Sequence, residues 1–308
     1  MLISLMFWQV CAALVIALTL DKLLGEPKRF HPLIGLGNVI SFIEKKYYAK
    51  RRINGVVAVV LLSLPVTLLY WVNIPWWLQA VVLYFVIGGR SLGEHGRAVA
   101  DALRQNDLSL ARERVGYIVS RRTENLDESQ VINATIESML ENGNDAVFGA
   151  LFWFIVGGAP AAIIYRIANT LDARWGYKND KYFLFGWFAA NWDDWLNYIP
   201  ARLCVLTYAI QGNVADALTC ARVQGAQCAS PNGGPVMASG AGSLGITIGG
   251  AAEYDGYKCD KPLLGKGPKP DWNSINNAIQ LVDRGAILWA VCLGIVYFSL
   301  LLSQGISL

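Results

Sequence analysis

An apolar run at residues 151–172 is interrupted in its middle by residues 157–160, Gly-Gly-Ala-Pro, and is closed by Arg166, Asn169 and Asp172. Each arm has about ten residues, whereas a transmembrane helix needs about 20. Glycine permits a tight turn, and proline suits the first turn of a second helix. The run therefore predicts a re-entrant helical hairpin over residues 147–171. A single kinked span is the alternative, because membrane helices tolerate glycine and proline.

Broken backbone at membrane depth has a functional implication. It is tolerated only where protein or a water-filled cavity surrounds it, since lipid cannot hydrogen-bond the freed backbone groups. We therefore expect the hairpin to lie near the working part of the molecule.

The composition is that of an integral membrane protein with substantial polar segments. Of 308 residues, 54% are hydrophobic and 16% are charged, against roughly 25% charged residues in a soluble protein. We predict an all-α membrane protein with about four transmembrane helices, the hairpin, cytosolic helices and Gly/Pro-rich loops. No soluble part separates cleanly, so residues 1–308 are predicted to form one membrane-embedded domain. The predicted spans cover residues 4–20, 55–72, 76–90 and 286–302, and residues 91–104 could continue the third as one long helix.

Basic residues predict the orientation. Residues 21–53 and 91–146 are rich in lysine and arginine, whereas the link at 73–75 carries none. The positive-inside rule places both basic segments in the cytosol. A re-entrant hairpin keeps residues 172–285 on that side as well. The six cysteines show no C-x-x-C pair, so no structural metal cluster is predicted, and free thiols favour a reducing compartment for the loops.

The polar segment before the hairpin predicts helices at residues 94–105 and 108–118, and a third that begins at Asp127. Gln130 stands three residues after Asp127, which is the spacing of a capping box. In the third helix Asn133, Glu137 and Glu141 share a face at i, i+4 and i+8. Taken alone, such a face is more often solvated surface than a site.

Residues 208–270 contain many glycines and prolines and predict loop. Glycine at this density can expose backbone N–H groups to an anion, although simple turns are the commoner explanation.

Polar residues gather beside the ends of the predicted membrane segments. Carboxylates together with amide oxygens suit Mg²⁺, whose shell usually includes water and substrate phosphate. Arginines bind phosphate or carboxylate in bidentate fashion. The pattern favours phosphoryl or acyl-phosphate chemistry, with ion pairs that hold loops together as the alternative. The residues are Asp21, Glu26 and His31; Glu137, Glu141, Asn142 and Asp145; Asn169, Asp172, Tyr177, Asp193, Asp194, Asn197 and Arg202; and the arginines Arg90 and Arg121.

Several established motifs are absent from the sequence. It contains no P-loop, no Rossmann glycine fingerprint with its acidic residue, no G-x-S-x-G elbow and no H-E-x-x-H. A nucleotide site, if one exists, must therefore be built without these signatures.

A set of short segments occurs in a fixed order along nearly the whole chain. The segments are 21–27 with His31-Pro32; 111–127; Glu137-Ser138 with Glu141-Asn142 and Asp145; Gly157 to Pro160; Asn169 to Asp172 with Gly176-Tyr177; Asp193-Asp194 with Asn197; Pro200 to Leu203; and Ser230-Pro231-Asn232. In this order they resemble the CobD/CbiB family, the adenosylcobinamide-phosphate synthases of cobalamin biosynthesis.

The resemblance implies a multi-pass enzyme of the bacterial cytoplasmic (inner) membrane whose active face is cytosolic. It implies an ATP-dependent amide ligase that joins aminopropanol, or its phosphate, to the free propionate of adenosylcobyric acid. ATP and Mg²⁺ would serve activation of the carboxylate as an acyl phosphate. The expected partners are this corrinoid, the amino alcohol phosphate, the lipid bilayer, and a second copy or other cobalamin-assembly enzymes, but no nucleic acid.

Site roles follow from residue type and motif match. The catalytic candidates are Glu137, Glu141, Asp172, Asp193 and Asp194. The candidates for substrate or phosphate binding are His31, Arg90, Arg121, Asn142, Asn169, Tyr177, Asn197, Arg202, Ser230 and Asn232. The candidates for Mg²⁺ are Asp145, Asp172 and Asp193.

Two departures and two alternatives stand beside this interpretation. Arg122 occupies a position where the family usually has aspartate, and residues 145–151 differ from the usual Asp-Gly-Val-Val-Ala-Pro-Leu. Both affect the rim of the site or the preferred amino alcohol. A non-catalytic AmpE-like membrane sensor should lack Asp193, Asp194, Asn197 and residues 230–232. A transporter fits the broken helix, but the sequence shows no inverted repeat.

Overall fold

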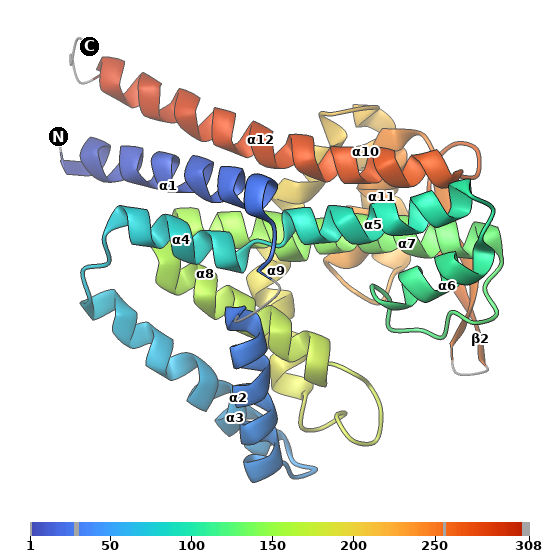
Figure 1. The fold of residues 1–308 in the computed structure, drawn as a ribbon, viewed down its shortest axis with the longest axis horizontal. Helices are drawn as coiled ribbons and strands as arrows, with labels where there is room; N and C mark the ends of the chain where they lie inside the picture. Colours follow the sequence, from blue (N-terminus) through green and yellow to red (C-terminus); the bar gives the residue numbers. More distant parts are fainter. Residues whose placement is uncertain (1, 28–30, 255–256, 304–308) are drawn as a thin grey trace. The chain divides into compact units, whose positions relative to one another are not determined.

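The computed structural model describes residues 2–27, 31–254 and 257–303, and helices make up nearly all regular structure in this part of the chain (Figure 1). The sheet within these residues has two strands. The predicted all-α class is therefore confirmed. The chain forms two compact units, each assembled from segments that are distant in sequence. Unit 1 comprises Met1–Gly88, Gly149–Asn197 and Trp289–Leu308, and unit 2 comprises Gly89–Phe148 and Tyr198–Leu288.

Within the described residues, four helical stretches are long and apolar enough to cross a membrane. They are Phe7–Leu24, Arg52–Trp71, Glu128–Trp175 and Trp272–Ser303. Three of them coincide with the predicted spans at 4–20, 55–72 and 286–302, and the fourth contains the predicted hairpin. The orientation of the spans and the single-domain assignment stay predictions.

The predicted span at residues 76–90 is interrupted. Helix α4 (Trp76–Val86) has 11 residues and ends where Ile87 adopts an extended conformation. Helix α5 (Gly89–Arg104) then begins separately, because two successive glycines at 88 and 89 weaken helix propagation. Since a crossing needs about 20 residues, the expectation of one long helix through residues 91–104 is wrong.

Helix α8 (Gly149–Trp175) folds back on itself at two glycines. Gly157 and Gly158 leave helical geometry, and Gly158 adopts φ 66° and ψ −160°, a conformation available essentially to glycine alone. The Cα of Gly149 lies against the hydroxyl of Tyr165, although a straight helix would separate these residues by about 24 Å. The Gln79 Oε1 atom accepts a hydrogen bond of 3.3 Å from the N–H of Ala159, just after the break. The chain therefore forms a helical hairpin and not a single kinked span.

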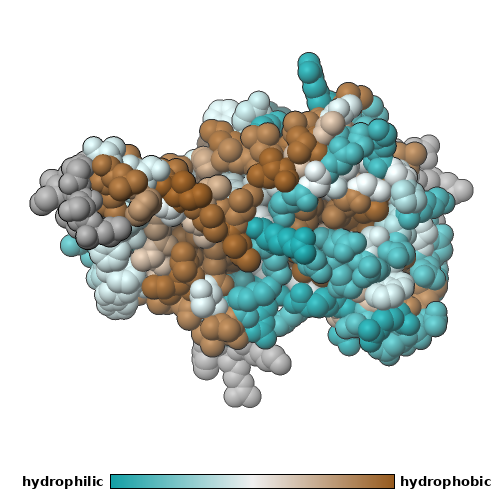
Figure 2. Space-filling view, turned by 90° about the horizontal axis from the view of Figure 1, so that it is seen from above, coloured by the Kyte–Doolittle hydropathy of each residue, from teal (hydrophilic) through white to brown (hydrophobic). Residues whose placement is uncertain are grey.

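The second arm of this hairpin is part of the core of unit 1. Its Leu171 and Trp175 pack with Ile40, Val59 and Phe185, all buried. Figure 2 shows hydrophobic side chains gathered over one part of the surface and hydrophilic side chains over another. Unit 1 contains α1 (Leu2–Leu24), α2 (Pro32–Tyr47), α3 (Arg52–Thr67), the 3₁₀ segment η1 (Leu68–Trp71), α4, α8, the start of α9 (Trp187–Ala209) and the end of α12 (Trp272–Ser303).

Unit 2 is built around α7 (Glu128–Gly143), which starts with the predicted capping box. The N–H of Gln130 donates to Asp127 at 2.8 Å, and the N–H of Asp127 donates to the Gln130 side chain at 2.9 Å. Unit 2 also contains α5, α6 (Leu108–Gly116), the π-helical η2 (Asn144–Phe148), α10 (Val214–Val223), η3 (Gly225–Gln227), α11 (Gly233–Leu244), β1 (Thr247–Tyr254), β2 (Tyr257–Gly265) and the remainder of α9 and α12.

The loop predicted for residues 208–270 is wrong, since this region contains two helices and an antiparallel hairpin. The small residues of α11 allow close packing, because Gly240 lies against Leu140 and Gly242 against the backbone of Ala217. Strands β1 and β2 pair with an irregularity between Gly249 and Ala251. Here glycine serves close helix packing and a bulge.

Helix α9 has two distinct faces. Its buried face carries Asp193, Asn197, Cys204 and Tyr208. An exposed apolar stripe follows the helical period on the other face. Its residues are Trp195, Ile199, Leu203 and Leu206, and Ile210 continues it just after the helix; all five are 36–81% exposed. When hydropathy is averaged along the sequence, the polar residues of the buried face offset the apolar residues of this stripe.

Candidate functional site

A chain of hydrogen bonds in unit 1 joins α8 to α9. The Tyr165 hydroxyl donates to Asn197 Oδ1 at 2.9 Å, and Asn197 Nδ2 donates to Asp193 Oδ2 at 3.1 Å. All three side chains are buried. Trp153, on the first arm of α8, donates to the carbonyl of Leu196 at 3.0 Å. The hairpin thus fixes Asp193 and Asn197 in place, two of the predicted site residues.

Asp172 lies two helical turns after Tyr165, on the same face of α8 and near the end of that arm. Asn169 stands between them on this face. Asp172 is half-buried, touches Gly176, and lies close enough to Asp194 for the two carboxylates to interact electrostatically. Unit 1 therefore contains the predicted site residues Asn169, Asp172, Asp193, Asp194 and Asn197, and their role stays a prediction.

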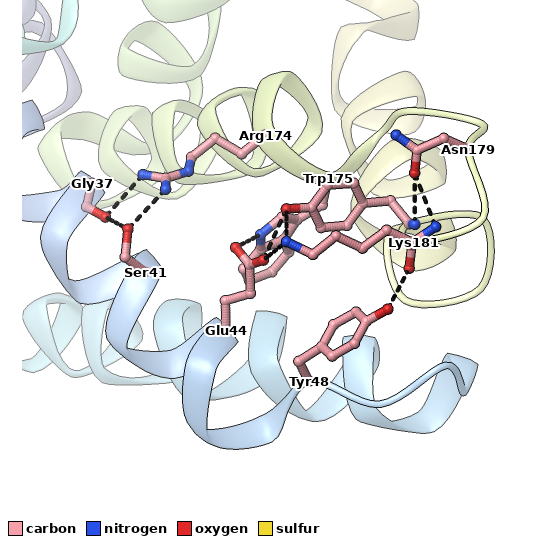
Figure 3. A network of polar contacts seen from close by, with 9 residues as sticks. Gly37, Ser41, Glu44, Tyr48, Arg174, Trp175, Asn179 and Lys181 are labelled. Atoms are coloured by element: carbon pink, nitrogen blue, oxygen red, sulfur yellow. Dashed lines mark hydrogen bonds and ion pairs between the residues drawn. The ribbon is translucent and has the colours of Figure 1, made fainter.

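A second polar network, shown in Figure 3, holds the end of α8 against α2. Glu44 accepts hydrogen bonds from Trp175 Nε1 at 3.0 Å, and from Lys181 Nζ and the Tyr182 hydroxyl at 2.8 Å each. Arg174 donates to the carbonyl of Gly37 at 2.9 Å and to Ser41 at 2.8 Å. The network fixes the turn that follows Asp172.

The charge balance of this network shifts two pKa values. Burial alone would raise the pKa of Glu44, but hydrogen bonds from Lys181, Tyr182 and Trp175 outweigh it and lower that pKa. The hydrogen bond to Glu44 raises the pKa of Lys181. The carboxylate of Glu44 is thus held in its ionised form.

Two predicted binding residues of unit 1, His31 and Tyr177, have different surroundings from these carboxylates. His31 is buried and caps α2, since its Nδ1 accepts a 3.2 Å hydrogen bond from the N–H of Leu33. Its ring packs edge-on against Phe85. Tyr177 is 45% exposed in the turn after α8. The geometry of His31 is that of a helix cap.

In unit 2, Glu137 is bound by two cations. Its Oε2 accepts from Arg121 at 3.2 Å and from Lys261 Nζ at 2.9 Å. The carboxylate is buried, and the Arg121 side chain is only 6% exposed. The alternative prediction, that the face with Asn133, Glu137 and Glu141 is solvated surface, is therefore wrong at Glu137.

The remaining polar residues of unit 2 meet at the start of α11. Glu141 lies against Gly233, close to the Ser230 hydroxyl. Ser230 Oγ accepts hydrogen bonds from the N–H groups of Asn232 at 3.3 Å and Gly233 at 2.9 Å. Arg202 donates to Asn232 Oδ1 at 2.5 Å and lies over the ring of Tyr198 at 3.8 Å. Unit 2 therefore brings together four of the predicted site residues, Glu141, Arg202, Ser230 and Asn232, and their role stays a prediction.

Three predicted residues of unit 2 make local contacts. Asn142 donates to the carbonyl and hydroxyl oxygens of Ser138. Asp145 accepts from Asn144 at 3.0 Å. Arg90 pairs with Glu94 one turn along α5 at 2.6 Å.

Lys261 is a site residue that sequence reasoning missed. It lies on β2, 124 positions after its partner Glu137. Its segment reads as loop, and no spacing rule connects it to α7. The segment 258–269 carries four lysines, and nothing in their spacing distinguishes Lys261 from the others.

The residues present provide no complete protein cage for a metal ion. Within the described part of the chain, no group of three or more histidine, cysteine, aspartate or glutamate side chains is placed to hold one. Mg²⁺ commonly uses one or two carboxylates, with phosphate and water completing its shell. Asp172, which interacts electrostatically with Asp194, fits that smaller requirement.

Comparison with known proteins settles the family. The family model described as CobD/Cbib protein matches residues 14–282. This chain belongs to the CobD/CbiB family. It is 52% identical over 292 residues to the cobalamin biosynthesis protein CobD of Chromobacterium violaceum, covering 90% of this chain and 93% of that protein. Family members from Stutzerimonas stutzeri and Clostridium tetani are 50% and 33% identical, each over 90% of this chain and at least 94% of theirs. No solved structure gives a significant match.

Proposed function

We propose that this protein acts in cobalamin biosynthesis as an ATP-dependent amide ligase. It attaches aminopropanol phosphate, or aminopropanol, to the free propionate of adenosylcobyric acid. The observation that carries the proposal is the match, over nearly the whole of both chains, to a protein named cobalamin biosynthesis protein CobD. The helices long enough to cross a membrane support action at a bilayer.

The chemistry divides into two displacements. A propionate oxygen attacks the γ-phosphorus of ATP, the bond to the bridging oxygen breaks, and ADP leaves. The amine nitrogen then attacks the acyl carbon, the carbon–oxygen bond to phosphate breaks, and the nitrogen gives up a proton. Catalysis of such steps is mainly positioning and charge neutralisation.

The groups of unit 2 suit the phosphates. Arg202 is fixed by Asn232 and by the Tyr198 ring, so its remaining N–H donors are pre-oriented for phosphate oxygens. The Ser230 turn and Gly233 bring backbone close to the same point. Glu137 holds both Arg121 and Lys261, and these three groups together carry one net positive charge.

The groups of unit 1 suit the amine and the cation. Asp172 and Asp194 interact electrostatically, and their carboxylates would attract an ammonium group before transfer. Either carboxylate would also suit Mg²⁺, which would supply positive charge to a substrate oxygen. Asp193 is oriented by Asn197.

The test is reconstitution. Purified protein in detergent or nanodiscs is incubated with adenosylcobyric acid, aminopropanol phosphate, ATP and Mg²⁺, and products are resolved by mass spectrometry. The expected product has the mass of the amide, with ADP and phosphate formed in equal amounts. Omission of each substrate is the control. Absence of the amide with verified substrates refutes the ligase and favours a non-catalytic membrane role.

A further inference from the structure

Unit 2 contains a pocket of about 550 Å³ between α9, α10 and the turn that leads into α11. Most of its lining is small and apolar: Val205, Leu218, Ala221, Ala226, Pro231 and Pro235. Ligand pockets of roughly 300–1,000 Å³ enclose molecules of nucleotide or drug size. A bare amino alcohol phosphate needs neither this volume nor these apolar walls.

Two arginines line the same pocket. Arg202 comes from α9 and Arg222 from the last turn of α10. Arg202 donates a hydrogen bond of 2.5 Å to Asn232 and lies over the Tyr198 ring, so one edge of its guanidinium group is already hydrogen-bonded. Arg222 is exposed. An anchored and an exposed guanidinium together suit a ligand carrying several phosphate charges.

The pocket opens next to the Ser230 turn. Pro231 and Pro235 flank Asn232 and Gly233, and both prolines belong to the lining. The N–H groups of Asn232 and Gly233 already bond to Ser230 Oγ. The anionic end of a ligand would thus lie toward Arg202 and Arg222, while its apolar part contacts the alanine, valine and leucine walls.

We propose that this pocket binds the nucleotide, with Arg202 and Arg222 on its phosphates and the apolar walls around its base. The proposal rests on the proposed ligase function, because that function requires ATP. It adds Arg222 to the binding residues and replaces a missing P-loop with guanidinium groups on two successive helices.

The first test measures nucleotide affinity. ATP binding to the purified full-length protein is followed by titration calorimetry for wild type, Arg222→Met, Arg222→Lys and Arg114→Met. Arg222→Met should weaken ATP binding at least tenfold, and Arg222→Lys by less, because lysine keeps the charge but loses the planar fork. Arg114 is an exposed arginine of α6, so Arg114→Met should bind normally. Unchanged affinity in Arg222→Met overturns the proposal.

The second test uses Cys228, a partly buried thiol in the pocket wall. Burial raises the pKa of Cys228, so alkylation is run at mildly alkaline pH and quantified on the Cys228 peptide. ATP should slow modification of Cys228 at least fivefold in wild type, and the Arg222→Met variant should lose that protection. Protection by aminopropanol phosphate or inorganic phosphate instead of ATP, or by phospholipid nanodiscs without nucleotide, overturns the assignment.

The two proposals fail separately. Amide formation by wild-type protein, with no ATP protection of Cys228 and normal binding in Arg222→Met, removes the pocket assignment and leaves the ligase intact. ATP binding and protection without any corrinoid product leaves the nucleotide pocket and removes the ligase.

Discussion

The two polar clusters differ in how their carboxylates are held. In unit 2, Glu137 is bound by Arg121 and Lys261. In unit 1, Asp193 accepts from the amide of Asn197, and Asp172 has a second carboxylate, Asp194, as an electrostatic neighbour. A carboxylate that holds cations in place supports structure, whereas adjacent carboxylates create negative potential available to a ligand. The first should therefore matter most for stability and the second for turnover.

The largest effect is expected at Glu137. Glu137→Ala removes the acceptor of the almost fully buried Arg121, and breaking a buried pair by removing one partner costs about 3–5 kcal/mol. Chemical denaturation in detergent should show this loss. The exposed Glu124→Ala is the matched control, with a change below about 0.5 kcal/mol. Equal stability of the two variants would erase the contrast between the clusters.

The next effect is kinetic. Asp172→Asn keeps the shape of the side chain but removes one of two adjacent charges, so amide formation should fall by about 100-fold or more while the melting temperature stays near that of wild type. Asp180→Asn, at an exposed position in the following turn, should keep full activity. Wild-type turnover in Asp172→Asn would show that the unit 1 carboxylates do no chemistry.

A smaller effect is expected at the hairpin break. Gly158→Ala forces a side chain into a glycine-only conformation and against the Gln79 amide, at a cost of about 1–3 kcal/mol. Because α8 carries Tyr165 and Asp172, activity should fall together with stability. Gly35→Ala, which points into open space within α2, should leave the melting temperature unchanged or slightly raised. Identical behaviour of the two alanine variants would argue against the folded-back hairpin.

The smallest effect concerns pH. The pKa of Glu44 is lower in the folded state, so its contribution to stability is present above the unfolded-state value and is lost as pH falls through the folded-state value. Lys181 is 53% exposed, so the contribution is at most about 1 kcal/mol. Glu44→Gln should lower the melting temperature slightly at pH 7 and match wild type under acid conditions. A constant difference at both pH values would contradict this account.

Periodicity predicted the elements that depend on local sequence. The hairpin glycines, the Asp127 capping box and three of the membrane spans follow from spacing and residue type alone. The spacing of Glu137 and Glu141 also placed both on α7, but their partners Lys261 and Gly233 lie far along the chain. Such pairings depend on tertiary packing and leave no periodic trace.

Glycine-rich and mixed helices were the hardest to predict. Helix α11 forms despite its glycines because Gly240 and Gly242 permit contacts that larger side chains would block. In helix α9, Asp193 and Asn197 on the buried face interrupt the apolar pattern, so the exposed stripe is hard to recognise in the sequence. In both, packing against neighbours outweighs intrinsic propensity. Division into two units assembled from interleaved segments also leaves no compositional boundary.

The contact between Gly149 and Tyr165 imposes a coupled constraint on evolution. Any side chain at position 149 would collide with the phenol that orders Asn197 and, through it, Asp193. Tyr165→Phe does not make room for a side chain at position 149, because the ring carbons of residue 165 would still overlap the new Cβ. Only a smaller side chain at position 165 would make room, and it would remove the group that donates to Asn197, so the two positions can change together only at the expense of the site.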